Sequence, residues 1–133
     1  MKKSVLDSYA IITFLFKEKG HEKVLKLFEW AAENDVINYI TAPNWAEVRY
    51  IIQRKVGIRK WEEVRQKLLR LPFEIIPADQ ALAELAGEIK ASYKMSLADC
   101  FAAALAKMKK LEVYTGDPEF QEVEPNIKIV WLL

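Results

Sequence analysis

Cysteine and histidine are nearly absent from this sequence of 133 residues, which has one of each, Cys100 and His21. A single cysteine cannot form an intrachain disulfide, and this usage fits a reducing cytoplasm. A single histidine in a polar turn gives little support to a Ser-His-Asp or Cys-His catalytic site. Without a His/Cys cluster, zinc is not the expected metal. The sequence also contains no P-loop and no GxGxxG motif, which argues against the common nucleotide-binding folds.

Long apolar runs and a strong excess of charge are absent as well. No run is long enough to cross a membrane. The chain begins with a basic pair and an apolar stretch, as a signal peptide does, but Asp7 interrupts the stretch and no small-residue cleavage site follows. We therefore expect a cytoplasmic protein with no membrane partner. The net charge of +1 means that any signal for nucleic-acid binding must be local.

Short β-prone runs alternate with helical patterns along the whole chain. Its length suggests one domain, residues 1–133, and its 52% hydrophobic content suffices for a real core. The expected strands are Ser4–Leu6, Tyr39–Thr41, Phe73–Ile76, Glu112–Thr115 and Ile127–Leu132. The expected helices are Tyr9–Lys17, His21–Asn34, Pro43–Val56, Arg59–Leu71, Ala78–Ser92 and one that Ser96 caps. This alternation predicts an α/β fold, a three-layer α/β/α sandwich with a mainly parallel central sheet.

Four acidic residues occupy positions where such a fold could bring them together. Asp7 and Asp117 directly follow two of the expected strands, Asp99 opens a late helix, and Glu47 lies inside a middle helix. Each alone has an ordinary explanation as a helix cap, a capping-box acid, a turn residue or an exposed glutamate paired with a nearby arginine. Together they are expected at the carboxyl edge of the sheet, where open α/β folds bind ligands.

Carboxylates gathered in this way need a cation or raised pKa values. Two like charges about 4 Å apart repel by roughly 4 kcal/mol at an effective dielectric constant near 20. Oxygen-only ligands favour Mg²⁺ or Mn²⁺. Such ions are typical of enzymes acting on phosphates, where they activate water and neutralise the leaving group.

Five segments in the same order resemble the PIN domain family, and more narrowly the VapC-type ribonuclease toxins of prokaryotic toxin–antitoxin pairs. They are VLDSYAIITFL, APNWAEV, SLADCFAAALAK, VYTGDPEFQEVE and the closing IKIVWL. The resemblance spans the chain from end to end, although roughly residues 57–92 carry no family signature. It implies divalent-metal-dependent hydrolysis of RNA phosphodiester bonds, a homodimer, and a small antitoxin that blocks the site.

The resemblance also implies roles for individual residues. The catalytic, metal-holding carboxylates would be those of Asp7, Glu47, Asp99 and Asp117. The polar residues Ser8 and Thr115 would flank the site, and Glu119 would be an acid of its outer shell. Two alternatives remain: an RNA-processing nuclease without an antitoxin, and a catalytically idle PIN-like module that serves as a binding or scaffold protein. Retention of all four acids counts against the idle module.

RNA approaching a negative site needs cations around it, and the middle of the chain has the densest basic run. The candidate RNA contacts are Arg49, Arg54, Lys55, Arg59 and Lys60, with Tyr50 and Trp61 placed to stack bases. An equally good interpretation is a pair of helices with solvated cations outside and aromatic residues in the core. Abundant aromatic residues also suggest a dimer patch among Phe14, Phe16, Trp30, Trp45 and Trp61.

Overall fold

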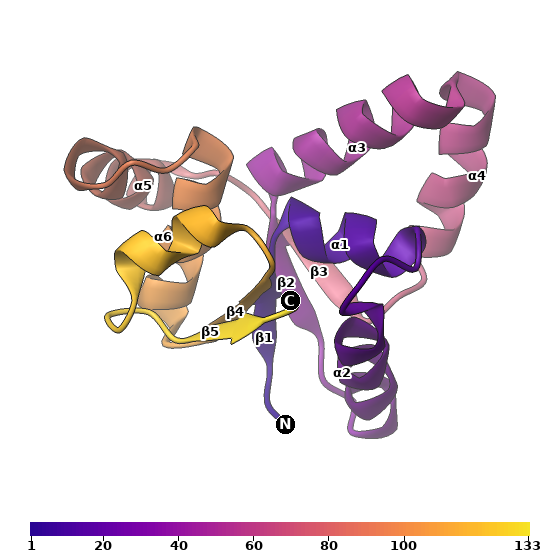
Figure 1. Ribbon diagram of the computed structural model, residues 1–133, viewed down its shortest axis with the longest axis horizontal. Coiled ribbons are helices and arrows are strands. Elements are labelled where there is room, and N and C mark those ends of the chain that lie inside the picture. Colours follow the sequence, from indigo (N-terminus) through magenta and orange to yellow (C-terminus); the bar gives the residue numbers. More distant parts are fainter.

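The computed structural model describes residues 1–133 and contains five strands, six α-helices and one 3-10 helix (Figure 1). In chain order they are β1 (Ser4–Leu6), α1 (Ser8–Leu15), α2 (His21–Glu33), β2 (Asn38–Thr41), α3 (Ala42–Val56), α4 (Ile58–Leu68), β3 (Phe73–Ile76), α5 (Gln80–Ser92), α6 (Leu97–Lys109), β4 (Glu112–Thr115), η1 (Pro118–Val123) and β5 (Ile129–Trp131). None of the helices has the length and apolar character needed to cross a membrane.

All five strands are parallel, in the order β3-β2-β1-β4-β5. Strand β1 is central: Val5 pairs with Tyr39 of β2 on one side and with Val113 of β4 on the other. The chain first builds the sheet from β1 towards β3 and then returns to add β4 and β5 on the other side. The carboxyl ends of β1 and β4 therefore flank the switch point of the sheet, the usual place of a ligand site in open α/β folds.

Helices cover both faces of the sheet, which confirms the predicted three-layer α/β/α sandwich (Figure 1). Helices α5 and α6 pack on one face around Val5 and Val113, and helices α1 to α4 pack on the other around Leu6 and Ile40. Every residue of α6 from Cys100 to Ala106 is buried, and most of them are small, so this helix lies close to the strands.

The observed elements agree with the prediction in type and order and differ at several ends. Helix α1 stops at Leu15 rather than Lys17, because Lys17 adopts a left-handed backbone with φ of 52°. Helix α4 ends at Leu68, and residues 69–71 form a turn instead. Strand β5 is shorter than expected, since Ile127 donates its backbone N–H to Val123 rather than to the sheet. The 3-10 helix η1 was not predicted.

The structure decides between the two interpretations of Trp61. This side chain is 1% exposed and packs 5.8 Å from Trp45 between ring centroids, so it lies in the core and is not available to stack a base.

The aromatic residues suggested for a dimer patch differ in burial. Trp61 is buried, whereas Phe14, Phe16, Trp30 and Trp45 are partly buried and pack against the core cluster that contains Trp61. The packing of α1 to α4 therefore accounts for part of their surface, and the dimer stays a prediction.

Candidate active site

Asp7 lies at the end of β1 and caps α1. Its Oδ1 accepts the backbone N–H of Ala10 at 2.8 Å, and its Oδ2 accepts the hydroxyl of Thr115 from the end of β4. The side chain is fully buried, and burial raises its pKa from 3.8 to about 7 even though both hydrogen bonds favour the charged form. The nearby carboxylates of Asp117 and Glu47 raise the pKa further. Asp7 is thus a rigid carboxylate that the fold holds at an electrostatic cost.

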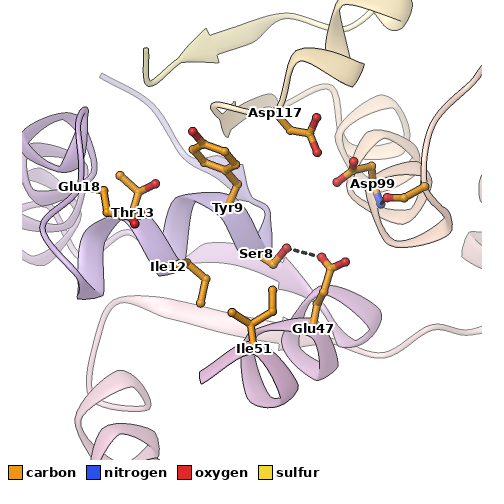
Figure 2. Close-up of a pocket in the computed structure, with 10 residues that line it drawn as sticks. Ser8, Tyr9, Ile12, Thr13, Glu18, Glu47, Ile51, Asp99 and Asp117 are labelled. Carbon is orange, nitrogen blue, oxygen red and sulfur yellow. Dashed lines mark hydrogen bonds between the residues drawn. The ribbon is translucent and has the colours of Figure 1, made fainter. Parts of the chain in front are cut away.

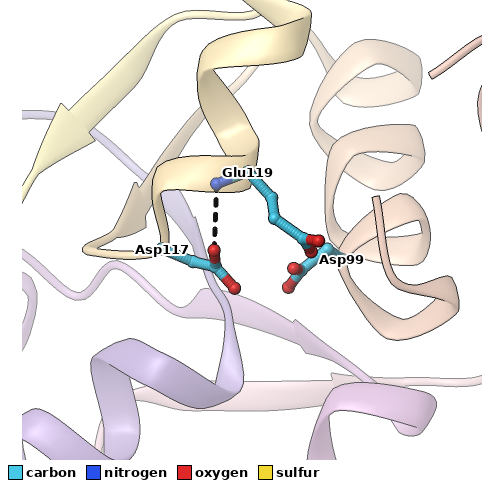
Figure 3. Close-up of side chains that lie close together, drawn as sticks. All are labelled: Asp99, Asp117 and Glu119. Carbon is cyan, nitrogen blue, oxygen red and sulfur yellow. Dashed lines mark hydrogen bonds between the residues drawn. The ribbon is translucent and has the colours of Figure 1, made fainter. Parts of the chain in front are cut away.

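The turn after β4 aims a second carboxylate at the same region. Thr115 Oγ1 accepts the backbone N–H of Asp117 at 3.0 Å, so one hydroxyl joins Asp7 to this turn. Asp117 then caps η1, with its Oδ1 accepting the N–H of Glu119 at 2.9 Å (Figure 3).

Asp99 lies in the first turn of α6, but it does not complete the expected capping box. The hydroxyl of Ser96 accepts the N–H of Asp99 at 3.3 Å, as a cap should. The N–H of Ser96, however, is bound at 3.1 Å by Glu119 Oε1. Glu119 therefore replaces Asp99 as the capping acid, and the carboxylate of Asp99 is left free to face the other acids.

Three carboxylates converge at this point. Ligand atoms of Asp99, Asp117 and Glu119 all lie within 4.8 Å of one another (Figure 3). Burial, the charge of Asp7 and close contact with the other two carboxylates raise the pKa of Asp99 to about 9. No lysine or arginine forms an ion pair with any of them.

This donor set fits a divalent cation. Oxygens on opposite sides of one Mg²⁺ are about 4.2 Å apart, because each bond is about 2.1 Å long. The carboxylates would need to move little to reach that spacing, and a cation would relieve the repulsion that raises the pKa of Asp99.

Glu47 faces this cluster from α3, across a cavity of about 290 Å³ (Figure 2). Its Oε1 accepts the hydroxyl of Ser8, and its Oε2 lies 3.5 Å from the hydroxyl of Tyr50. Ten residues line the cavity: Ser8, Tyr9, Ile12, Thr13, Glu18, Glu47, Ile51, Ser96, Asp99 and Asp117.

The predicted residues therefore fall into three positions. Asp99 and Asp117 meet directly, Glu47 lies across the cavity from them, and Asp7 is buried beneath and acts on them through its charge. Glu119, expected in an outer shell, has its carboxylate within the same group as Asp99 and Asp117.

Sequence reasoning missed the part of the cavity that α1 and the following turn provide. Tyr9, Ile12 and Thr13 share one face of α1 with Ser8, which was predicted to flank the site, and this signal was available in the sequence. Glu18 carried no such signal, because its place depends on the turn between α1 and α2.

The basic residues proposed for RNA contact are all exposed, but only two of them line a hollow. Arg49 and Arg54 do so on the outer side of α3, together with Tyr50 and Gln53. The guanidinium of Arg54 lies 4.9 Å from the centroid of the Tyr50 ring. The remaining cations are elsewhere: Lys60 pairs with Glu63, Lys55 lies over the ring of Phe16, and Arg59 lines no cavity.

Comparison with known proteins agrees with this geometry. The sequence model of the PIN domain matches residues 4–125. Among curated proteins, none matches the sequence.

Several solved structures share the fold. The DNA-bound VapBC of Salmonella typhimurium is 21% identical with a TM-score of 0.77, and the match covers 100% of each chain. A toxin–antitoxin complex from Klebsiella pneumoniae is 20% identical with a TM-score of 0.75 and covers 98% of each chain. VapC20 of Mycobacterium tuberculosis, a sarcin-ricin loop cleaving toxin, is 16% identical with a TM-score of 0.72, and the match covers 92% of this chain and 95% of that one.

Proposed function

Because the chain belongs to the PIN domain family, we propose that it is a divalent-metal-dependent endoribonuclease that hydrolyses RNA phosphodiester bonds. The observation that carries this proposal is the convergence of Asp99, Asp117 and Glu119 within 4.8 Å, beside a buried Asp7. A fold that gathers four acids without a single basic partner is built to hold a cation.

The ion would be Mg²⁺ or Mn²⁺, held by Asp99, Asp117 and Glu119 with Asp7 and Glu47 alongside. When bound, such an ion supplies Lewis-acid activation of water and charge stabilisation on the leaving oxygen. The protein supplies rigidity. Thr115 and Ala10 hold the Asp7 carboxylate in one orientation, and Ser8 does the same for Glu47.

The RNA backbone would leave the acidic cavity along α3. Tyr50 lies between Glu47 and the hollow of Arg49 and Arg54, so the two sites adjoin. Two arginines there could bind a phosphate next to the scissile one, and Tyr50, which is 44% exposed, could stack a base.

We further propose that the biological role is that of a toxin, in the cytoplasm, as a homodimer that a small antitoxin blocks. Support comes from the sequence resemblance and from the toxin–antitoxin complexes among the structures that share the fold. Expression of the wild-type chain should then arrest growth, and co-expression of the antitoxin should restore it.

RNA cleavage with mapped cut sites tests the nuclease proposal. The wild-type protein should cleave RNA in the presence of Mg²⁺ or Mn²⁺, and EDTA should abolish this cleavage. The Asp99→Asn variant should not cleave RNA. Asp35→Asn is a matched control, since Asp35 is an exposed acid with a left-handed backbone that asparagine also tolerates. Cleavage that persists in EDTA, or equally in Asp99→Asn, would refute the proposal.

A further inference from the structure

The cavity beside the acids has a second half that the proposed hydrolysis does not use. One end holds Glu47, Asp99 and Asp117, and the other is built from the α1 face and from α3 (Figure 2). The lining of that other end comprises Tyr9, Ile12, Thr13, Ile51 and Glu18. An apolar slot open to a cluster of metal ligands suits a flat group attached to the reacting phosphate.

Tyr9 forms a fixed wall of this slot. A methyl group on Gly116 would lie 2.3 Å from Tyr9 Cε1, so the ring packs directly against the backbone of the turn after β4. A side chain at position 116 would displace the ring from this contact, which lies beside the same turn that carries Asp117. Ile12 of α1 and Ile51 of α3 line the same cavity, below the ring in the view of Figure 2.

Glu18 supplies a charged group at the far end of the slot. Its backbone is held on both sides, because its N–H donates to the Thr13 carbonyl at 3.0 Å and its carbonyl accepts the N–H of His21 at 3.0 Å. Its carboxylate makes no hydrogen bond or ion pair within the chain. Glu18, which is exposed, thus adds an unpaired carboxylate to the lining of the cavity.

We propose that this half of the cavity is a guanine subsite for a nucleotide adjoining the scissile phosphate, which deepens the proposed nuclease function and rests on it. A carboxylate offers two acceptors and no donor. Guanine has two adjacent donors on its Watson–Crick edge, N1–H and the N2 amino group. Adenine, cytosine and uracil each place an acceptor where a carboxylate oxygen would meet it. The Tyr9 ring and the two isoleucines hold the base by stacking and apolar contact, and Glu18 selects it.

Binding of nucleoside monophosphates tests the subsite without any cleavage. GMP, AMP, CMP and UMP carry the same phosphate, so differences among them report the base. In Mg²⁺ buffer, GMP should shift the methyl resonances of Ile12 and Ile51 and bind at least about tenfold more tightly than the other three. Glu18→Gln should lose that preference, because an amide presents one donor and one acceptor. Glu22→Gln is the matched control: this exposed acid is near in sequence but lines no part of the cavity.

Cut-site mapping on an RNA of mixed sequence gives the second readout. The wild type and Glu22→Gln should cut beside guanine, and Glu18→Gln should cut with that preference reduced about tenfold or more. Metal-dependent cleavage with no base preference, together with equal binding of the four nucleotides, would overturn the subsite and leave the nuclease proposal intact. Guanine-selective binding that depends on Glu18, in a protein that cleaves no RNA, would refute the nuclease and retain a guanine nucleotide site.

Discussion

Replacing Asp7 by asparagine should stabilise the metal-free protein at neutral pH while removing its activity. Asparagine can still accept the Ala10 N–H through its Oδ1, but it carries no charge. The pKa of Asp7 is about 7 in the folded protein against an ordinary 3.8. The folded state therefore keeps a proton that the unfolded chain releases, and the stability of the wild type falls as pH rises from about 4 to about 7.

The size of the effect follows from the two pKa values. Each pH unit in that window costs up to about 1.4 kcal/mol, so the wild type should lose roughly 2.5 kcal/mol from this group between pH 5 and pH 8. The variant should not lose that amount. The pKa of Asp99, raised to about 9 by burial and in part by the charge of Asp7, works in the same direction. The variant removes that charge and lowers the pKa of Asp99, so the change at Asp99 adds to the difference between the two proteins.

Urea unfolding in EDTA at pH 5, 6, 7 and 8 measures this difference directly. The free energy of unfolding of Asp7→Asn, relative to wild type, should rise by roughly 2.5 kcal/mol across the series. RNA cleavage by the same variant should fall at least about a hundredfold, which equals roughly 2.7 kcal/mol in the activation barrier. Parallel pH profiles for the two proteins would show that Asp7 is not the buried group that titrates, and the electrostatic argument for the site would fail.

Three further predictions concern the metal, the cavity wall and the oligomer. Mg²⁺ or Mn²⁺ should raise the melting temperature of the wild type, and Asp99→Asn should remove most of that shift; an equal shift in the variant would put the ion elsewhere. Gly116→Ala should destabilise the protein by displacing the Tyr9 ring, and the loss should shrink in a Tyr9→Ala background; additive free energies of unfolding would contradict the contact. Light scattering at micromolar concentration should report twice the chain mass, and a monomer would count against the dimer.

Much of the fold followed from the sequence, because apolar strands and amphipathic helices alternate with clear caps and breaks. Position relative to a strand end was enough to single out Asp7 and Asp117, since parallel strands end at one edge. What could not be predicted depends on contacts between distant segments. The capture of the Ser96 N–H by Glu119, which frees the Asp99 carboxylate, joins residues 23 apart and leaves no local pattern.

The exposure of side chains on helices was the other feature that the sequence could not predict. The aromatic residues around α3 and α4 looked available for RNA or for a partner, and the basic residues between them reinforced that impression. Trp61 instead fills the core, because α4 folds back on α3 and turns that face inward. Sequence periodicity shows which residues share a face of a helix, but the packing of the next helix decides whether that face is exposed.

The hydrogen bond between Thr115 and Asp7 joins residues 108 apart and links β4 to the first strand of the sheet. During synthesis on the ribosome β1 is made early. One side of this central strand stays without a pairing partner until β4 has been made. Asp117, which follows β4, is made after the other three acids. A nascent chain therefore cannot assemble the acidic centre before β4 and the turn after it have been made and have joined β1.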